Sequence, residues 1–75
     1  MAKFTGQVVQ VQGSVVDVAY AEGELPGLFE SIEIEREGET PLVLEVQKHL
    51  GDNWVRTVAM DTTDGLRRGV DAVST

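Results

Sequence analysis

Few residues of this 75-residue chain are of types that carry out chemistry, and they are scattered along it. His49 is the only histidine, so we expect neither a catalytic triad nor a cluster of imidazoles. It stands at the end of a predicted strand, opposite Trp54, and a surface pair is the simplest interpretation. Trp54 itself is either a surface anchor or part of an interface.

Oxygen ligands occur together only in the run Asp61-Thr62-Thr63-Asp64. These groups could suit a hard cation, but a calcium loop needs more carboxylates at alternating positions. Hydroxyl and carboxylate groups that bind their own backbone and fix a turn are the preferred interpretation. No metal-binding residue is therefore predicted.

Three common nucleotide-binding and catalytic motifs are missing from the sequence. It has no Gly-x-x-x-x-Gly-Lys-Ser/Thr phosphate loop, no Gly-x-Gly-x-x-Gly and no His-Glu-x-x-His. We predict no catalytic and no cofactor-binding residue, and we expect this chain alone not to be an enzyme. The pair Arg67-Arg68 could bind an anion or an acidic partner, or simply form a solvated loop.

Length and charge narrow the possible functions further. A chain of 75 residues forms one small domain, here residues 1–75, with little room for an enclosed active site. Its net charge of −7 is opposite to that of proteins that bind nucleic acid. There is no cysteine, no apolar run long enough to span a membrane, and no apolar signal region at residues 1–4. We expect a cytoplasmic domain that binds no nucleic acid and does not insert into a membrane.

The elements that must position these residues centre on a predicted hairpin from Leu42 to Met60. Both of its arms are rich in β-branched residues, and Gly51-Asp52 suits a tight turn with positive φ. If Leu50 faces Asn53, the outward face pairs His49 with Trp54, Gln47 with Arg56, Glu45 with Val58, and Val43 with Met60. The same register turns Leu44, Val46, Val55, Thr57 and Ala59 toward the core, together with Lys48.

Further strands are expected at residues 4–11, 15–20, 31–36 and 70–73, because apolar and polar residues alternate there. Gly13 interrupts the first two and predicts a bend or bulge. Proline and glycine at residues 21–27 and 37–41 predict loops. The sequence shows no helical period, so the fold class is all-β, and a small closed six-stranded β-barrel is favoured because closure removes exposed strand edges.

Three blocks of sequence resemble the start of the beta subunit of the F-type ATP synthase. They are residues 7–18, residues 23–26, and the long run 42–69, which includes Leu-Gly-Asp-Asn-Trp at 50–54 and Asp-Gly-Leu-Arg-Arg-Gly at 64–69. The alpha-subunit barrel of the same fold family lacks the Leu-Gly-Asp to Asp-Gly-Leu run, which favours beta. Ser14 and Gly27 depart from the residues common in the family, so these loops should be somewhat looser.

The resemblance implies a six-stranded barrel that joins neighbouring alpha and beta barrels in a crown on the catalytic head. ATP or ADP, magnesium and the nucleotide-binding domain belong to the parent protein and lie beyond this segment, so no cofactor is expected in residues 1–75. The parent would sit on the cytoplasmic side of a bacterial inner membrane and couple ATP synthesis or hydrolysis to proton transport. The barrel alone should be largely monomeric, because its charge of −7 repels other copies.

An interface with neighbouring alpha subunits is expected on the outward face of the hairpin and on the arginine pair. Its candidate residues are Val43, Trp54, Arg56, Val58, Met60, Arg67 and Arg68. Arg56 is expected to be held by Glu45 across the diagonal. The alternative is a free-standing small barrel that binds a peptide or an oligonucleotide, which would need basic and aromatic residues along one strand face.

Overall fold

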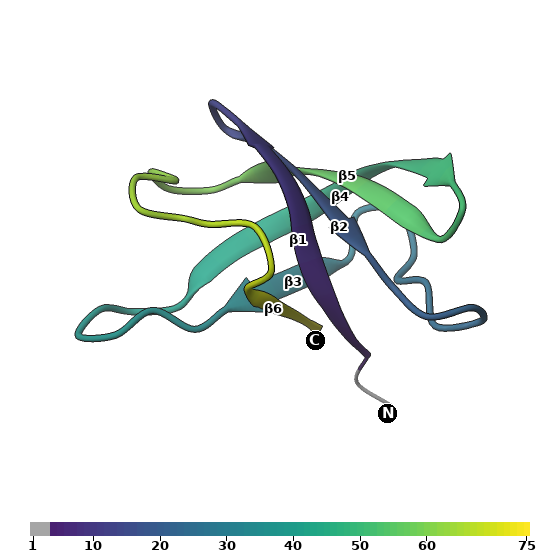
Figure 1. Cartoon of the computed structure of the whole chain (residues 1–75), viewed down its shortest axis with the longest axis horizontal. Coiled ribbons are helices and arrows are strands. Elements are labelled where there is room, and N and C mark those ends of the chain that lie inside the picture. The colour runs from purple at the N-terminus through teal and green to yellow at the C-terminus, as the bar shows by residue number, and fades with distance from the viewer. Residues whose placement is uncertain (1–3) are drawn as a thin grey trace.

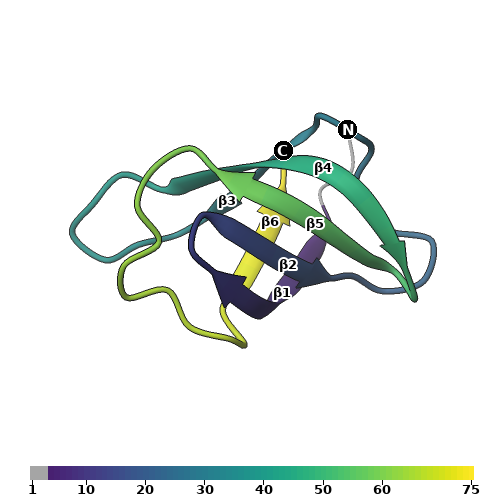
Figure 2. The same cartoon turned by 90° about the horizontal axis from the view of Figure 1, so that it is seen from above.

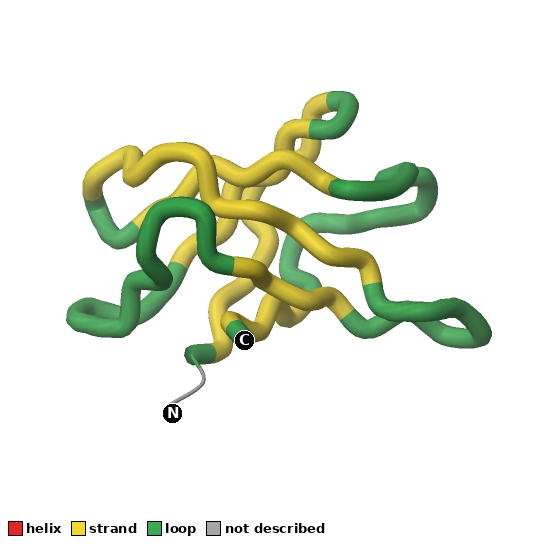
Figure 3. Tube along the Cα trace, turned by 180° about the vertical axis from the view of Figure 1, so that it is seen from behind, coloured by secondary structure: helices red, strands yellow, loops and turns green. Residues whose placement is uncertain are grey.

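The computed structural model describes residues 4–75 and consists of strands joined by turns and loops (Figures 1 and 3). The strands are β1 (Thr5–Gln12), β2 (Val15–Ala19), β3 (Ser31–Ile34), β4 (Leu42–Gly51), β5 (Trp54–Ala59) and β6 (Asp71–Ser74). They form a closed barrel in the order β1-β2-β5-β4-β3-β6, and every neighbouring pair is antiparallel. The predicted all-β class and closed six-stranded barrel are confirmed. The expectation about a signal region at residues 1–4 falls largely on residues 1–3, which lie outside the described part.

Alternation of apolar and polar residues explains why these segments form a barrel. In β3, Ile32 and Ile34 are buried while Ser31 and Glu33 are exposed, since successive side chains of a strand point to opposite faces. All six strands or their ends contribute side chains to one core. Figure 2 shows the strands arranged around the barrel. Its buried members are Val8, Val16, Val18, Tyr20, Ile32, Ile34, Leu42, Leu44, Val46, Val55 and Ala72. Two polar side chains, Thr57 and Ser74, are buried with them.

The long hairpin of β4 and β5 has the predicted register only in the half that lies away from its turn. Leu44 pairs with Ala59, Glu45 with Val58 and Val46 with Thr57, as expected. Beyond them the register shifts twice, between Val46 and Lys48 and between His49 and Gly51. The predicted pairs of Gln47 with Arg56, His49 with Trp54 and Lys48 with Val55 are therefore wrong. Lys48 faces Arg56, His49 faces Val55, and Gly51 faces Trp54.

The turn of this hairpin accounts for part of the shift. Asp52 and Asn53 have φ values of 53° and 63°, and Gly51 before them has a φ of 90°. Two central residues with positive φ fit the twist of a two-residue hairpin loop, and aspartate and asparagine tolerate this conformation better than most side chains. The turn is therefore centred on Asp52-Asn53, one residue later than Gly51-Asp52.

Gly13 has a different role from the predicted bend. With a φ of 61° it forms the tight turn that reverses the chain from β1 into β2, whose residues pair back along β1. The irregularity that bends the first strand lies instead at Val9, between Val8 and Gln10. A bulge at this place increases the local twist and helps the sheet to close.

Candidate interaction surface

The best-defined polar contact on the outer wall joins β2 to β5. Arg56 donates from Nε to Asp17 Oδ1 over 3.0 Å and from Nη2 to Asp17 Oδ2 over 3.1 Å. The Asp17 side chain is 4% exposed and that of Arg56 is 46% exposed. Asp17, by its hydrogen bond and then by its charge, raises the pKa of the Arg56 guanidinium above its ordinary value.

The expected contact of Arg56 with Glu45 is therefore wrong. The Cα register places Asp17 directly opposite Arg56, whereas Glu45 is opposite Val58. The side-chain amide of Gln47 donates to Glu45 Oε1 at 2.7 Å. The sequence does not predict Asp17 as the partner of Arg56, because it contains no signal that β2 lies beside β5.

A second feature of the outer wall is apolar. Val58 is half-buried between its cross-strand neighbours Val15 and Glu45. The backbone N–H of Met60 donates to the carbonyl of Val43 at 2.9 Å, so these two residues lie opposite each other as predicted. Met60 is 56% exposed and Val43 is half-buried. The structure thus brings Val43, Val58 and Met60 close together at one end of the hairpin.

Trp54 lies at the other end of the hairpin, 39% exposed, between Ala19 and Gly51. His49 is not its partner, because His49 Nε2 lies 2.8 Å from the carbonyl oxygen of Pro26. Two more exposed apolar residues, Leu28 at 50% and Phe29 at 68%, were not predicted. Phe29 has a φ of 66°, which is uncommon for a bulky residue. Leu28 and Phe29 lie in a loop, where no alternating pattern indicates which side chains are exposed.

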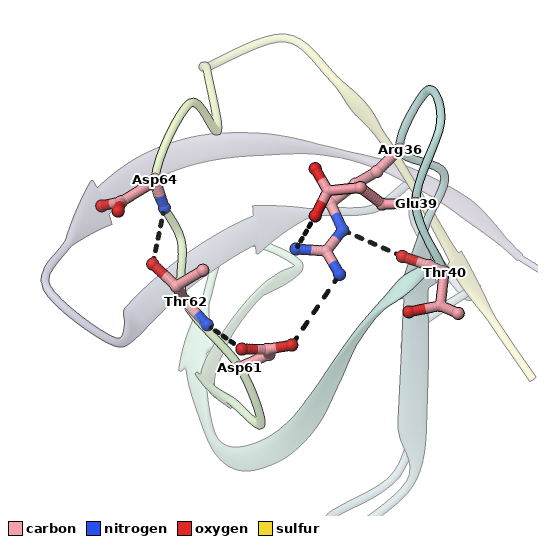
Figure 4. A network of polar contacts seen from close by, with 6 residues as sticks. All are labelled: Arg36, Glu39, Thr40, Asp61, Thr62 and Asp64. Carbon is pink, nitrogen blue, oxygen red and sulfur yellow. Dashed lines mark hydrogen bonds and ion pairs between the residues drawn. The ribbon is translucent and has the colours of Figure 1, made fainter.

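The loop after β5 is fixed by its own side chains, as the sequence indicated. The N–H of Thr62 bonds to Asp61 Oδ1 at 2.7 Å, and the N–H of Asp64 bonds to Thr62 Oγ1 at 3.2 Å (Figure 4). The hydroxyl of Thr63 donates to the carbonyl of Gly13 at 2.7 Å. Within residues 4–75, no three His, Asp or Glu side chains are placed so that they could hold a metal ion.

Arg36 connects this loop to the one between β3 and β4. Its Nε donates to the carbonyl of Thr40 at 3.0 Å, and its Nη atoms lie 3.9 Å from Glu39 and 3.9 Å from Asp61 (Figure 4). A hollow of about 300 Å³ lies between the two loops, lined among others by Arg36 and Leu66. The Arg36 guanidinium is engaged by these contacts, so the role of Arg36 is to link the two loops. Arg67 and Arg68 follow in the same loop and are exposed.

A closed six-stranded antiparallel barrel with a packed interior places this chain among the small all-β barrel domains. The sequence matches the beta-barrel domain of the ATP synthase alpha/beta family over residues 8–75. The chain belongs to this family. None of the described residues forms a helix long and apolar enough to cross a membrane.

Proposed function

We propose that this chain is the N-terminal barrel of the beta subunit of an F-type ATP synthase and that it acts as a structural assembly module. The match of residues 8–75 to the alpha/beta barrel family carries the proposal. The choice of beta is supported by residues 50–54 and 64–69, which resemble that subunit. Residues 50–54 are the end of β4, the turn and the first residue of β5, and residues 64–69 lie in the loop between β5 and β6.

The barrel would associate with neighbouring alpha-subunit barrels in a crown that stabilises the catalytic ring. Its interior is filled by side chains from all parts of the wall, so the surface is what remains for contact. Met60 is exposed beside half-buried Val43 and Val58, and exposed apolar patches often form protein–protein interfaces. ATP, ADP and magnesium would be bound by the parent protein beyond this barrel, on a peripheral head at the cytoplasmic side of the membrane.

A domain graft tests the proposal. Residues 1–75 would replace the N-terminal barrel of the beta subunit in a bacterial ATP synthase and, in a matched experiment, that of the alpha subunit. We expect the beta graft to assemble with wild-type alpha subunits into a ring of native size on gel filtration, and the alpha graft not to do so. Assembly of the alpha graft alone would reverse the subunit assignment, and failure of both grafts with folded barrels would contradict the assembly function.

A further inference from the structure

One row of polar side chains crosses four strands of the outer wall. The register pairs Gln10 with Asp17, Asp17 with Arg56, and Arg56 with Lys48, from β1 through β2 and β5 to β4. Gln10, Arg56 and Lys48 are exposed and Asp17 is buried beneath them. Opposite residues of paired strands lie on the same face, so these groups form one continuous surface.

Asp17 uses only part of the hydrogen-bonding capacity of Arg56. A guanidinium has five N–H donors, and the carboxylate takes the one on Nε and one on Nη2. The remaining donors, on Nη1 and Nη2, have no hydrogen-bond partner among residues 4–75. Because Asp17 is 4% exposed and binds through both of its oxygens, it fixes the plane of the guanidinium.

A groove of about 320 Å³ lies beside this oriented group. It is lined by Gln10, Gln12, Val15, Asp17 and Arg56. The side-chain amides of the two glutamines can both donate and accept hydrogen bonds, and Val15 gives the groove an apolar side. The groove therefore offers hydrogen-bond donors and acceptors next to one apolar side chain.

The charge of the row differs from that of the rest of the molecule. Arg56 and Lys48 outweigh Asp17 there, although the whole chain has a net charge of −7. Like charges directly opposite each other on a sheet are unfavourable, and Asp17 offsets only one of the two. The two strands outside the row, β3 and β6, expose Glu33 and Asp71 instead. On the four strands of the row, Asp17 and Glu45 balance Lys48 and Arg56, so this part of the wall is close to neutral and less acidic than β3 and β6.

We infer that the row of Gln10, Arg56 and Lys48 is a docking site for carboxylates on the acidic face of an adjoining barrel. The open edge of Arg56 would take one carboxylate in bidentate form, and Lys48 would pair with a second carboxylate. An outward strand face with acids at alternate positions, such as Glu33 and Glu35 of this chain, has the required chemistry. The row would then lie in the contact between this barrel and a neighbouring barrel that presents carboxylates to it. The identity of the partner as a barrel rests on the proposed function, whereas the carboxylate chemistry does not.

Binding of short peptides to the isotope-labelled 75-residue chain tests this inference by NMR. The probe is a heptapeptide of alternating serine and glutamate, and the control is the same peptide with glutamine in place of glutamate. We expect the glutamate peptide to shift the side-chain Nε–H signal of Arg56 and the amide signals of Gln10, Gln12 and Lys48. The glutamine peptide should leave these signals in place. Equal shifts with both peptides would overturn the inference.

Variants test whether the residues of the row bind the peptide specifically or whether the positive charge of any residue is enough. Lys48→Gln should weaken binding about two- to fivefold, the size of one exposed ion pair. Arg68→Gln removes the same charge from the loop after β5 and should change binding less. Arg56→Lys keeps the charge but loses the planar fork, so it should weaken binding although the charge is unchanged. Equal effects of Lys48→Gln and Arg68→Gln, or wild-type binding by folded Arg56→Lys, would mean that only net charge matters.

A short single-stranded DNA distinguishes carboxylate from phosphate as the preferred anion. We expect it to bind this acidic chain more weakly than the glutamate peptide, and tighter binding at the same residues would overturn the assignment. The peptide experiment needs no other subunit and the domain graft needs no peptide. A graft that assembles while the peptide fails to bind would therefore reject this site and leave the proposed function standing.

Discussion

The hydroxyl of Tyr20 donates to the carbonyl oxygen of Ala72, 3.0 Å away, although 52 positions separate the two residues in sequence. Tyr20 follows the end of β2 and Ala72 lies on β6, and β1 is the strand between them in the barrel. Tyr20 is 6% exposed, and its burial raises the pKa of the phenol above the ordinary value of 10.0. This single bond therefore ties together two strands that are not neighbours.

Replacing Tyr20 by Phe removes this bond and keeps most of the ring's packing. We expect a loss of about 1 kcal/mol in the free energy of unfolding, typical of one buried neutral hydrogen bond. Urea denaturation at neutral pH measures the loss. No change in the midpoint would mean that the bond to Ala72 contributes nothing net to stability.

The raised pKa of Tyr20 also predicts the direction of a pH effect. The unfolded chain loses the phenol proton near pH 10.0, whereas the folded chain holds it to higher pH. The unfolded state then binds fewer protons, so the stability contribution is complete below pH 10.0 and falls as the pH rises toward the raised value. Urea midpoints of wild type should decline more steeply above pH 10.0 than those of Tyr20→Phe. Since Tyr20 is the only tyrosine, phenolate absorbance reports its ionisation directly.

The buried positions of a strand could be predicted from sequence, because apolar residues recur there at every second position. Leu44 and Val46 alternate with Glu45 and Gln47, and the buried and exposed faces followed from this pattern alone. The bulges at Gln47 and Leu50 could not be predicted, because an extra residue in a strand leaves no periodic signal. One undetected bulge reverses the face of every residue beyond it, and for this reason the predicted pairs near the turn were wrong.

The surface pair could not be predicted for a different reason. Asp17 and Arg56 are 39 positions apart, and their contact depends on β2 and β5 being neighbours. The sequence contains several acids that could pair with Arg56, and the local pattern gives no reason to prefer one of them. The loop side chains of Asp61 and Thr62 were predictable, because their bonds are to backbone within two residues.

The core prediction can be tested at adjacent positions of β4. Leu44 is fully buried and Glu45 is half-buried on the outer face. Leu44→Ala should lower the free energy of unfolding by about 2 to 5 kcal/mol, because it removes buried methyl groups and leaves a cavity. Glu45→Ala should cost far less, since mainly its contact with Gln47 is lost. Equal shifts of the two urea midpoints would contradict the assignment of the faces.

Nucleotide binding gives a further test. Because no phosphate-loop motif occurs in residues 1–75, we expect the chain alone neither to bind nor to hydrolyse ATP. Calorimetric titration with ATP and magnesium should show no saturable heat, and phosphate release should match a buffer control. A saturable site at micromolar ATP would contradict this prediction.

The apolar part of the outer wall gives another test, in the full-length subunit. Replacing Val58 and Met60 together by Ser should weaken ring assembly, because polar side chains then face the neighbouring barrel. The melting temperature of the isolated barrel should change little, as Met60 is more than half exposed and Val58 is only half-buried. Sedimentation of the ring and a thermal melt of the barrel measure the two effects. A large drop in melting temperature would show that these side chains stabilise the barrel itself.

Gly6 on β1 determines whether Tyr20 can reach Ala72. A Cβ atom at Gly6 would lie 2.5 Å from the carbonyl oxygen of Ala19 and 2.8 Å from the Tyr20 ring, closer than van der Waals contact allows. Gly6 pairs with Ala72, so the ring passes over β1 at the one place where the strand has no side chain. Gly6→Ala should therefore displace either the ring or the strand and cost about 1 to 3 kcal/mol, or more if the backbone cannot move. Gly27→Ala is the matched control, since its Cβ would meet only the Glu30 side chain, at 3.4 Å. Equal urea midpoints for the two variants would show that β1 shifts freely and that the absence of a side chain at Gly6 is not required for closure.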